Sequence, residues 1–179
     1  MCDTVGLSIA RIDHVPVHGG SLRIFAGCQS SMREHAHEVR RLADEERAIG
    51  MSTFATYEKF AADVHESRRE LVTLLNDFKH AKKTVAGYGA PAKGNTLLNF
   101  CGIDSDTLAY TVDKNPLKVG LYTPGTHIPV LPVSTVLDRQ PDYLLILAWN
   151  FAEEIMEQQR EYQKNGGRFI IPIPKPKVI

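Results

Sequence analysis

Hydrophobic residues in the second half of the chain occur in short runs separated by glycine, proline and charged residues. The runs stand at residues 84–89, 108–113, 128–130, 143–148 and 168–173. Stretches of helical composition lie between several of them, at residues 93–100, 132–137 and 151–164. Short apolar runs bounded by turn residues are typical of buried strands, and strands alternating with helices are typical of parallel sheets. The pattern predicts an α/β fold, a Rossmann-like parallel sheet with flanking helices.

The first half of the chain has a different pattern. Alternating apolar positions over residues 6–26 predict a two-stranded β-ribbon with its turn at residues 18–21. Residues 30–50 are rich in charge and poor in large apolar side chains, which predicts a mostly exposed helix. From residue 54 to residue 78 apolar residues recur every three to four positions, which predicts a long helix that either packs on a sheet or forms a coiled-coil seam.

These patterns predict three segments. We expect a β-ribbon over residues 1–26, a helical segment over 27–82 and a Rossmann-like domain over 83–179. A two-stranded ribbon buries too little apolar surface to be stable alone. The ribbon must therefore dock on the rest of the chain or on a separate partner.

Composition narrows the classes of function. The 179 residues include 21 Lys and Arg and 21 Asp and Glu, so the formal net charge is zero. Binding to nucleic acids or anionic membranes depends on a basic surface, so neither partner is expected. The three cysteines have no CxxC spacing and the histidines are scattered, so we expect no metal site. The absence of a disulfide framework, together with the lack of a long apolar run or a leader, favours a cytoplasmic protein.

The loop after the first predicted strand of the Rossmann-like domain carries a relaxed dinucleotide fingerprint. Gly87, Gly89 and Ala92 have the G-x-G-x-x-A spacing, and Lys93, Gly94 and Asn95 follow at the start of a helix. Glycines let a backbone approach a phosphate, and a helix N-terminus offers free N–H groups to it. The same glycines would also let a strand and a helix pack closely, so both interpretations remain open.

Further polar residues follow the other predicted strands. Asp113 stands 24 positions after Gly89, where a dinucleotide-binding domain places its ribose-binding acid, but it also fits a turn. The long loop over residues 118–127 ends in His127, which is either a general base or a residue that braces the loop. Trp149 and Asn150 end the most apolar strand, so they are expected at the same sheet edge.

Five motifs together resemble a known family. They are VHGGSLR (residues 17–23), GYGAPAKGNT (87–96), VDKNPLK (112–118), YTPGTHIPV (122–130) and LAWNF (147–151). In this order they resemble the C-terminal domain of S-adenosylmethionine-dependent C-methyltransferases that act on nucleotide-linked ketodeoxysugars. The resemblance covers roughly residues 5 to 174 and implies a Rossmann-like domain that closes over the nucleotide-sugar side of the active site. It also relates the β-ribbon over residues 1–26 to the last two strands of a methyltransferase sheet.

The resemblance implies roles for residues on the substrate side. The residues expected to bind substrate are Tyr88, Lys93, Asn95, Asp113, Asn115, Lys118, Tyr122, Thr126, His127 and Asn150. Gly87, Gly89 and Gly94 are expected to form a phosphate loop, and His18 and Ser21 to line a cleft between domains. The family's zinc cysteines, S-adenosylmethionine loop and proton-abstracting residues lie upstream of the matching segment. We therefore expect no catalytic residue and no bound cofactor on this chain, and no methyl transfer by the chain alone.

Two alternatives belong to other classes. The glycine fingerprint and Asp113 would also suit a free-standing NAD(P)-binding oxidoreductase, although no Tyr-Lys or His-Asp catalytic arrangement is visible. The ribbon and the long helix would also suit an assembly module that joins a separate methyltransferase subunit or a second copy of the chain.

Overall fold

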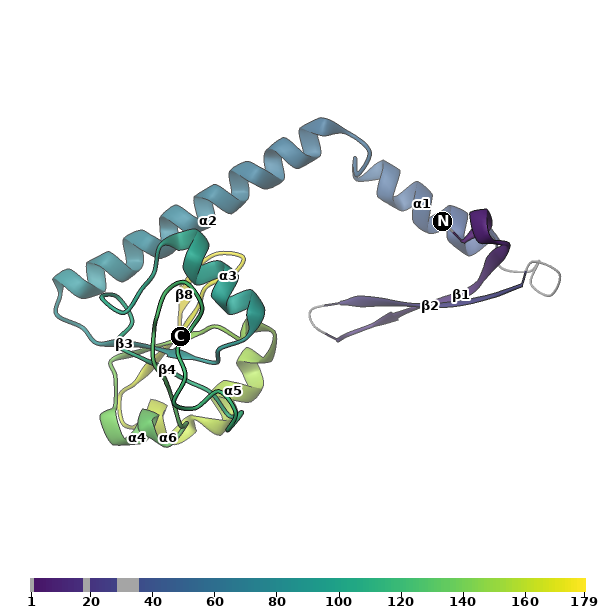
Figure 1. Ribbon diagram of the computed structural model, residues 1–179. Helices are drawn as coiled ribbons and strands as arrows, with labels where there is room; N and C mark the ends of the chain where they lie inside the picture. Colours follow the sequence, from purple (N-terminus) through teal and green to yellow (C-terminus); the bar gives the residue numbers. More distant parts are fainter. Residues whose placement is uncertain (1, 18–19, 29–35) are drawn as a thin grey trace. The chain divides into compact units, whose positions relative to one another are not determined.

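The computed structural model describes residues 2–17, 20–28 and 36–179 (Figure 1). The chain divides into two compact units, Met1–Ala62 and Asp63–Ile179. The sequence predicted three segments, divided at residues 26 and 82, and this division remains a prediction.

The first unit contains the predicted β-ribbon. After a short 3-10 helix, η1 (Asp3–Val5), strand β1 (Leu7–Val15) pairs antiparallel with β2 (Ser21–Cys28). Helix α1 (Ala36–Ala48) contacts β1, so part of the ribbon is covered. The predicted helix over residues 30–50 is therefore confirmed from Ala36 onward, and its beginning lies outside the described residues.

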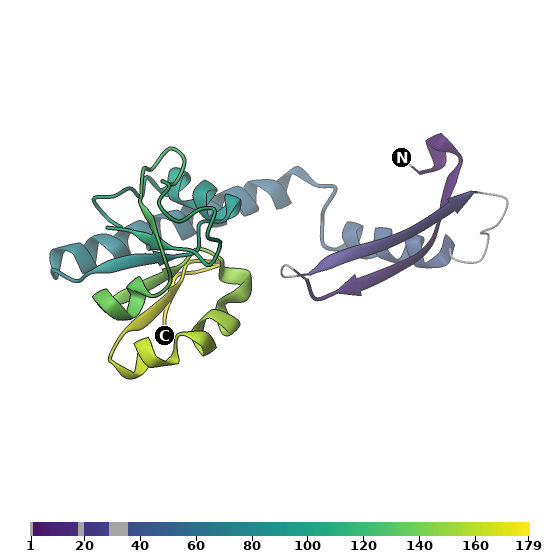
Figure 2. The same cartoon turned by 60° about the horizontal axis from the view of Figure 1, so that its bottom comes forward.

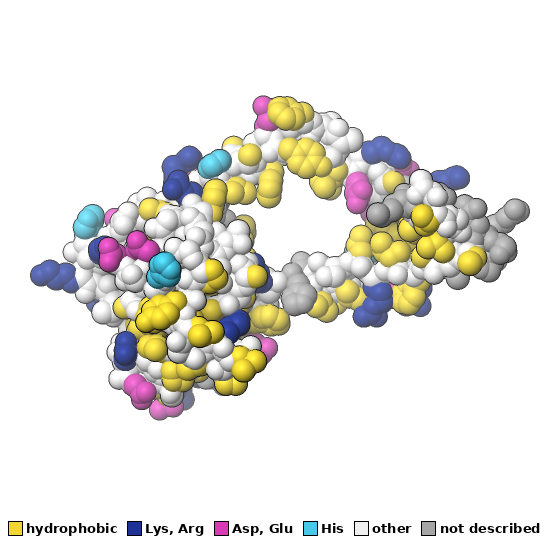
Figure 3. All heavy atoms as spheres, viewed as in Figure 1, with side chains coloured by type: hydrophobic (Ala, Val, Ile, Leu, Met, Phe, Trp, Pro, Cys, Tyr) yellow, Lys and Arg dark blue, Asp and Glu magenta, His cyan; other side chains and the backbone are white. Residues whose placement is uncertain are grey.

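The long helix α2 (Phe54–His80) begins where the sequence predicts. Leu71 and Leu75 in its second half are buried against the sheet of the second unit, which confirms packing on a sheet for that part. Its first half exposes Phe54 and Phe60, and Figure 3 shows hydrophobic side chains gathering there.

The second unit is built on a six-stranded sheet with the order β5-β4-β3-β6-β7-β8. Its strands are β3 (Val85–Tyr88), β4 (Thr111–Val112), β5 (Val130–Leu131), β6 (Tyr143–Ile146), β7 (Arg168–Ile171) and β8 (Lys177–Val178). Neighbouring strands are parallel except for β7 and β8, which are antiparallel. The chain moves outward from β3 to β4 and β5 and then crosses to β6 on the other side of β3. Ligands of open α/β sheets bind at such a switch point, at the carboxyl ends of the strands.

Helices cover both faces of this sheet (Figures 1 and 2). They are α3 (Ala92–Cys101), α4 (Thr135–Arg139), a 3-10 turn η3 (Trp149–Phe151), α5 (Ala152–Gln158) and α6 (Arg160–Lys164). Helices α2 and α3 pack on one face, and α4, α5 and α6 on the other. The predicted α/β fold is thus confirmed.

Alternating side chains explain why the sheet is covered on both faces. In β6, Leu145 joins the α2–α3 core whereas Leu144 and Ile146 join the α4–α6 core. In β7, Ile170 and Phe169 divide in the same way. Successive side chains of a strand point to opposite faces, so a strand with two covered faces requires a continuous apolar run.

Two details of the prediction were wrong. The helix predicted over residues 151–164 is interrupted at Gln159, whose φ of −105° and ψ of 25° are not helical. The last predicted strand ends at Ile171, and an unpredicted strand, β8, returns antiparallel to it. Among the described residues, no helix has the length and hydrophobicity needed to cross a membrane.

Asp142 ties the beginnings of the two central strands together. Its Oδ2 accepts hydrogen bonds from the Thr84 backbone N–H and hydroxyl, both at 2.8 Å, and its Oδ1 accepts one from Lys83 Nζ at 2.9 Å. The Thr84 N–H and then the Lys83 ammonium lower the pKa of Asp142 from 3.8 to about 2. The carboxylate therefore stabilises the fold above pH 3.8, and this contribution is lost as the pH falls towards 2.

We predict that Asp142→Asn lowers the free energy of unfolding by about 1–2 kcal/mol at pH 7, a figure reduced because the side chain is 35% exposed. Urea denaturation at pH 7 and at pH 2.5 measures the difference, which should shrink at the lower pH. Asp77→Asn, at an exposed carboxylate on α2, serves as the control. An equal loss at both pH values would contradict a role for the Asp142 charge.

Candidate functional site

A cavity of about 250 Å³ opens at the carboxyl edge of the sheet, at the switch point between β3 and β6. It is lined by Tyr88, Gly89, Pro91, Asp113, Lys114, Ala148, Phe151, Glu154 and Ile155. The lining comes from the ends of β3, β4 and β6 and from the first turn of α5. The cavity therefore lies where the topology of an open α/β sheet places a ligand.

The glycines of the β3–α3 segment are required for different structural reasons. A Cβ on Gly87 would lie 2.6 Å from Thr111 Oγ1, and a Cβ on Gly94 would lie 2.9 Å from Leu147 Cβ. Both glycines thus permit close packing in the core. Gly89 has a φ of +91°, a conformation that other residues rarely adopt, so it is the glycine that shapes the loop beside the cavity.

The start of α3 presents donors at this edge. Pro91 is the N-cap and no side chain caps the helix, so the first N–H groups of α3 have no side-chain acceptor within the described structure. Lys93 Nζ lies 4.6 Å from the centroid of the Trp149 ring, a cation–π contact. Partial burial lowers the pKa of Lys93. These groups together would suit an anion next to an aromatic surface.

Asp113 holds the β3–α3 loop to the end of β4. Its Oδ2 accepts from the Ala90 N–H at 2.7 Å and from Lys118 Nζ at 3.2 Å, and its Oδ1 accepts from the Asn115 N–H at 2.8 Å. Lys118 also donates to the Ala90 carbonyl at 2.9 Å. Burial alone would raise the pKa of Asp113, but the Asn115 and Ala90 N–H groups and Lys118 outweigh it and lower the pKa. The side chains of Asp113 and Lys118 therefore bind each other and the β3–α3 loop.

The long loop after Lys118 is internally braced. Thr123 and Thr126 are buried, with their hydroxyl oxygens 2.7 Å apart, and Thr123 Oγ1 also accepts from the Ile128 N–H. Asn99 Nδ2 on α3 donates to the Pro124 carbonyl at 3.0 Å, which fixes the loop to that helix. The hydroxyl of Thr126 is thus directed into the loop.

Two other predicted residues of this loop are exposed. The Tyr122 side chain is 65% exposed, and His127 is exposed with a φ of +51°. A left-handed conformation is uncommon for histidine and places this residue at the tight turn that closes the loop. Neither side chain lines the carboxyl-edge cavity.

The remaining predicted residues have distinct surroundings. Tyr88 is buried and lines the cavity, and burial raises its pKa. Asn115 Oδ1 accepts a hydrogen bond from the Leu117 N–H at 3.0 Å, an interaction typical of turns. Asn95 Oδ1 is buried without a hydrogen-bond partner among the described residues, and Asn150 is half-buried in η3.

The two residues predicted to line a cleft between domains belong to the first unit. Ser21 is exposed and its hydroxyl donates to the Val17 carbonyl at 3.0 Å. His18 lies outside the described residues.

Six residues that line the cavity were not predicted: Pro91, Lys114, Ala148, Phe151, Glu154 and Ile155. Lys114 Nζ and Glu154 Oε1 form an ion pair at 3.6 Å, and both side chains are more than half exposed. Lys114 and Phe151 stand inside the conspicuous motifs at residues 112–118 and 147–151, so they could have been selected. Glu154 lies in an ordinary helical stretch, and only the fold brings it to the cavity. The described residues contain no group of three or more His, Cys, Asp or Glu suited to hold a metal ion.

We predict that Gly94→Ala destabilises the fold by about 1–3 kcal/mol, because the new methyl group would collide with Leu147 in a packed core. Urea denaturation measures the change. Thr96→Ala, at an exposed position of the same helix, should stay within about 0.5 kcal/mol of the wild type. A fully tolerated Gly94→Ala variant would show that this glycine is not required for helix–strand packing.

Comparison with known proteins agrees with the motif-based resemblance. The chain is 39% identical over 174 residues to the C-methyltransferase NovU of Streptomyces niveus. This match includes 97% of the chain but only 41% of the relative's length. Residues 16–174 match the family described as the C-methyltransferase C-terminal domain. The chain therefore belongs to the C-methyltransferase C-terminal domain family.

Proposed function

We propose that this chain is the substrate-binding C-terminal part of an S-adenosylmethionine-dependent C-methyltransferase that acts on nucleotide-linked ketosugars. Family membership supports the reaction class, and the substrate class rests on the motif resemblance. The proposed position of the site is supported by the cavity at the switch point, which has the α3 N-terminus and Lys93 beside it.

The chemistry of the carboxyl edge suits the two ends of such a substrate. The N–H groups at the start of α3 and the Lys93 ammonium would bind the diphosphate, because both favour negative charge. Glu154 and the Lys114 ammonium at the mouth of the cavity would hydrogen-bond sugar hydroxyls. Tyr88 and Phe151 would supply apolar contact with the sugar ring. In this proposal the chain binds and orients the ketosugar, which is its contribution to the reaction rate.

S-adenosylmethionine would supply the methyl group in the complete enzyme. The described residues do not fit the role of its binding site, because the acid that could hold an adenosine ribose, Asp113, already accepts three hydrogen bonds from the chain. We therefore assign the cofactor and the removal of the proton beside the ketone to residues outside this chain. The chain alone should not methylate a ketosugar.

The same observation weakens the alternative of an NAD(P)-binding oxidoreductase. In that class an acid at the end of the second strand binds the ribose hydroxyls. Here the carboxylate of Asp113 is 12% exposed and is engaged by Ala90, Asn115 and Lys118. Close packing in the core also explains why glycine stands at positions 87 and 94.

The β-ribbon supports the further proposal that a methyltransferase domain or subunit covers it. Leu22, Ile24 and Phe25 on β2 are 49%, 53% and 43% exposed in the structure. The resemblance relates these strands to the last two strands of a methyltransferase sheet, in which such side chains would be buried. We also propose a cytoplasmic location, since the scattered spacing of the three cysteines provides no disulfide framework.

We predict that the chain binds dTDP, used as a probe of the nucleotide end, and that Lys93→Ala weakens this binding at least tenfold, because the variant loses a cation beside the proposed phosphate site. Isothermal titration calorimetry measures both. Lys164→Ala, at an exposed lysine on α6, is the matched control and should bind like the wild type.

Parallel titrations separate the alternatives. NADH and S-adenosylmethionine should give no binding heat. Binding of NADH in place of dTDP would contradict the proposed function and favour an oxidoreductase. Equal dTDP affinity of the Lys93→Ala variant would contradict the proposed phosphate site.

A further inference from the structure

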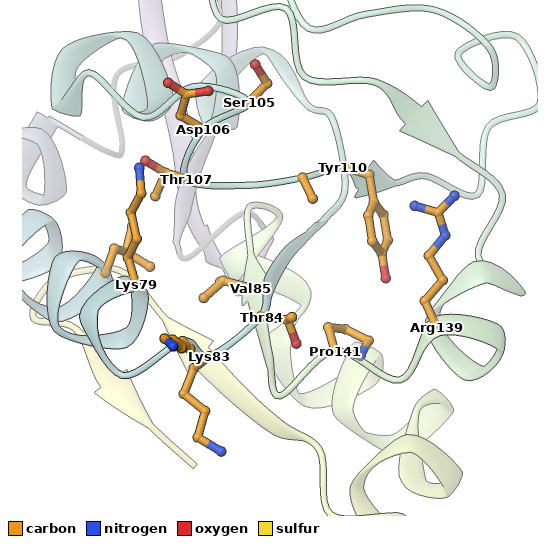
Figure 4. Close-up of a pocket in the computed structure, with 13 residues that line it drawn as sticks. Lys79, Lys83, Thr84, Val85, Ser105, Asp106, Thr107, Tyr110, Arg139 and Pro141 are labelled. Carbon is orange, nitrogen blue, oxygen red and sulfur yellow. The ribbon is translucent and has the colours of Figure 1, made fainter.

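Each end of β3 is held by a carboxylate that stands next to a neighbouring strand. At the beginning of β3, Asp142 binds Lys83 and Thr84, which Figure 4 shows in the wall of a cavity of about 460 Å³ at the amino edge. At the end of β3, Asp113 has the corresponding place, in the lining of the candidate substrate cavity. Its contacts fix the loop that leads into α3, so they bear on the site as well as on the fold.

Asp113 and Lys118 together bind both main-chain polar groups of Ala90. Asp113 Oδ2 accepts from the Ala90 N–H at 2.7 Å, and Lys118 Nζ donates to the Ala90 carbonyl at 2.9 Å. Lys118 Nζ also donates to Asp113 Oδ2 at 3.2 Å, which closes a ring of contacts around Ala90. Hydrogen bonds with an ionised partner are stronger than neutral ones, so this ring fixes the path of the chain at Ala90.

The other main-chain groups of the β3–α3 loop are also bound within the chain. The Gly89 N–H donates to the Val112 carbonyl at 2.6 Å, and the Gly89 carbonyl accepts from the Thr111 hydroxyl at 2.9 Å. Pro91 has no N–H, and its carbonyl accepts from the Asn95 N–H at 3.0 Å. A phosphate-binding loop presents its N–H groups to the ligand. This loop presents none, although it has the glycine spacing of a nucleotide-binding loop.

The donors at this edge therefore belong to α3. In the part of the chain that the structure describes, the N–H groups of Ala92, Lys93 and Gly94 have no hydrogen-bond acceptor. They follow Ala90 through Pro91, whose ring holds φ at −79°. Because this connection is stiff, the path of the chain at Ala90 sets the direction of the first N–H groups of α3.

We propose that Asp113 and Lys118 are positioning residues for the phosphate site, an inference that rests on the proposed function. They orient the α3 N–H groups through Ala90 and do not contact the substrate, although the resemblance implies that both bind it. A negative charge in the lining of an anion site opposes binding unless it has another role. The contacts of Asp113 and Lys118 with Ala90 supply that role.

The charge of Asp113 decides the sign of the first test. If this carboxylate acted only through its charge, Asp113→Asn would strengthen the binding of dTDP to the whole chain. As a positioning residue, its replacement should weaken dTDP binding about fivefold or more in calorimetric titration, because asparagine offers one acceptor oxygen where the carboxylate offers two. Unchanged or tighter binding by Asp113→Asn would overturn the proposal.

Lys118 provides a matched pair of variants. Lys118→Met should weaken dTDP binding about fivefold or more, whereas Lys118→Arg should stay within about twofold of the wild type, because a guanidinium can donate to both Asp113 and the Ala90 carbonyl. Lys164→Met, at an exposed lysine on α6, is the control and should bind like the wild type. An arginine variant that binds no better than Lys118→Met would count against the proposal.

The double variant Asp113→Asn/Lys118→Met shows whether the two residues act through one path. It should bind about as weakly as the weaker single variant, because both substitutions release Ala90. Wild-type affinity would mean that the two residues act only through opposite charges. A loss equal to the product of the two single losses would mean that Lys118 contacts the phosphate itself. Either result would overturn the proposal.

Amide hydrogen exchange without ligand separates this proposal from the proposed function. In Lys118→Met the amides of Ala90 and Asn95 should exchange about tenfold faster than in the wild type, because the start of α3 opens more often. The amide of Leu98 in the same helix should be unchanged, which shows that the variant is folded. Unchanged exchange at Ala90 and Asn95 would overturn the proposal whether or not dTDP binds. The expected exchange pattern in a chain that does not bind dTDP would contradict the proposed function and support the positioning of α3.

Discussion

The parallel pairing of β3 with β6 is the constraint on which both edges of the sheet depend. Val85 is in register with Tyr143 and Tyr88 with Ile146, so the two strands begin and end together. At the carboxyl ends, this register places the Gly89 loop beside Ala148 and allows α3 to approach Leu147 through Gly94. At the amino ends, the same register brings Thr84 to Asp142. One pairing thus positions the candidate substrate cavity at one edge and aligns the beginnings of the two strands at the other.

The motif around Gly87 illustrates how one sequence pattern can serve two purposes. In the structure the first and last glycines are explained by contacts with Thr111 and Leu147, whereas Gly89 shapes the loop through its positive φ. The geometry of a nucleotide-binding loop and the requirements of tight packing therefore favour the same residue types. The hydrogen bonds of Asp113 distinguish a packing role from a nucleotide-binding role. A carboxylate that already accepts hydrogen bonds from its own loop is poorly placed to bind a ribose.

The sequence predicted most of the fold because continuous apolar runs such as residues 143–148 are characteristic of doubly covered strands. It did not predict β8, which has two residues and is defined only by its pairing with β7. The break at Gln159 was also missed, since nothing in local composition distinguishes this residue from its helical neighbours. The carboxyl edge was predicted through its glycines and Asp113, but Glu154 was not, because it reaches the cavity only through the packing of α5. The pairing of Thr123 with Thr126 was likewise invisible in sequence, as it depends on the path of the loop.

The central claim is that the nucleotide end of the substrate binds at the carboxyl edge of this sheet. A titration of the ¹⁵N-labelled chain with dTDP, followed by amide chemical shifts, tests it most directly. The account predicts shifts confined to residues 89–95, 113–118 and 148–154, with the amides of Thr84 and Tyr110 at the opposite edge unchanged. Shifts concentrated at the amino edge, or a spectrum that dTDP does not alter, would contradict it.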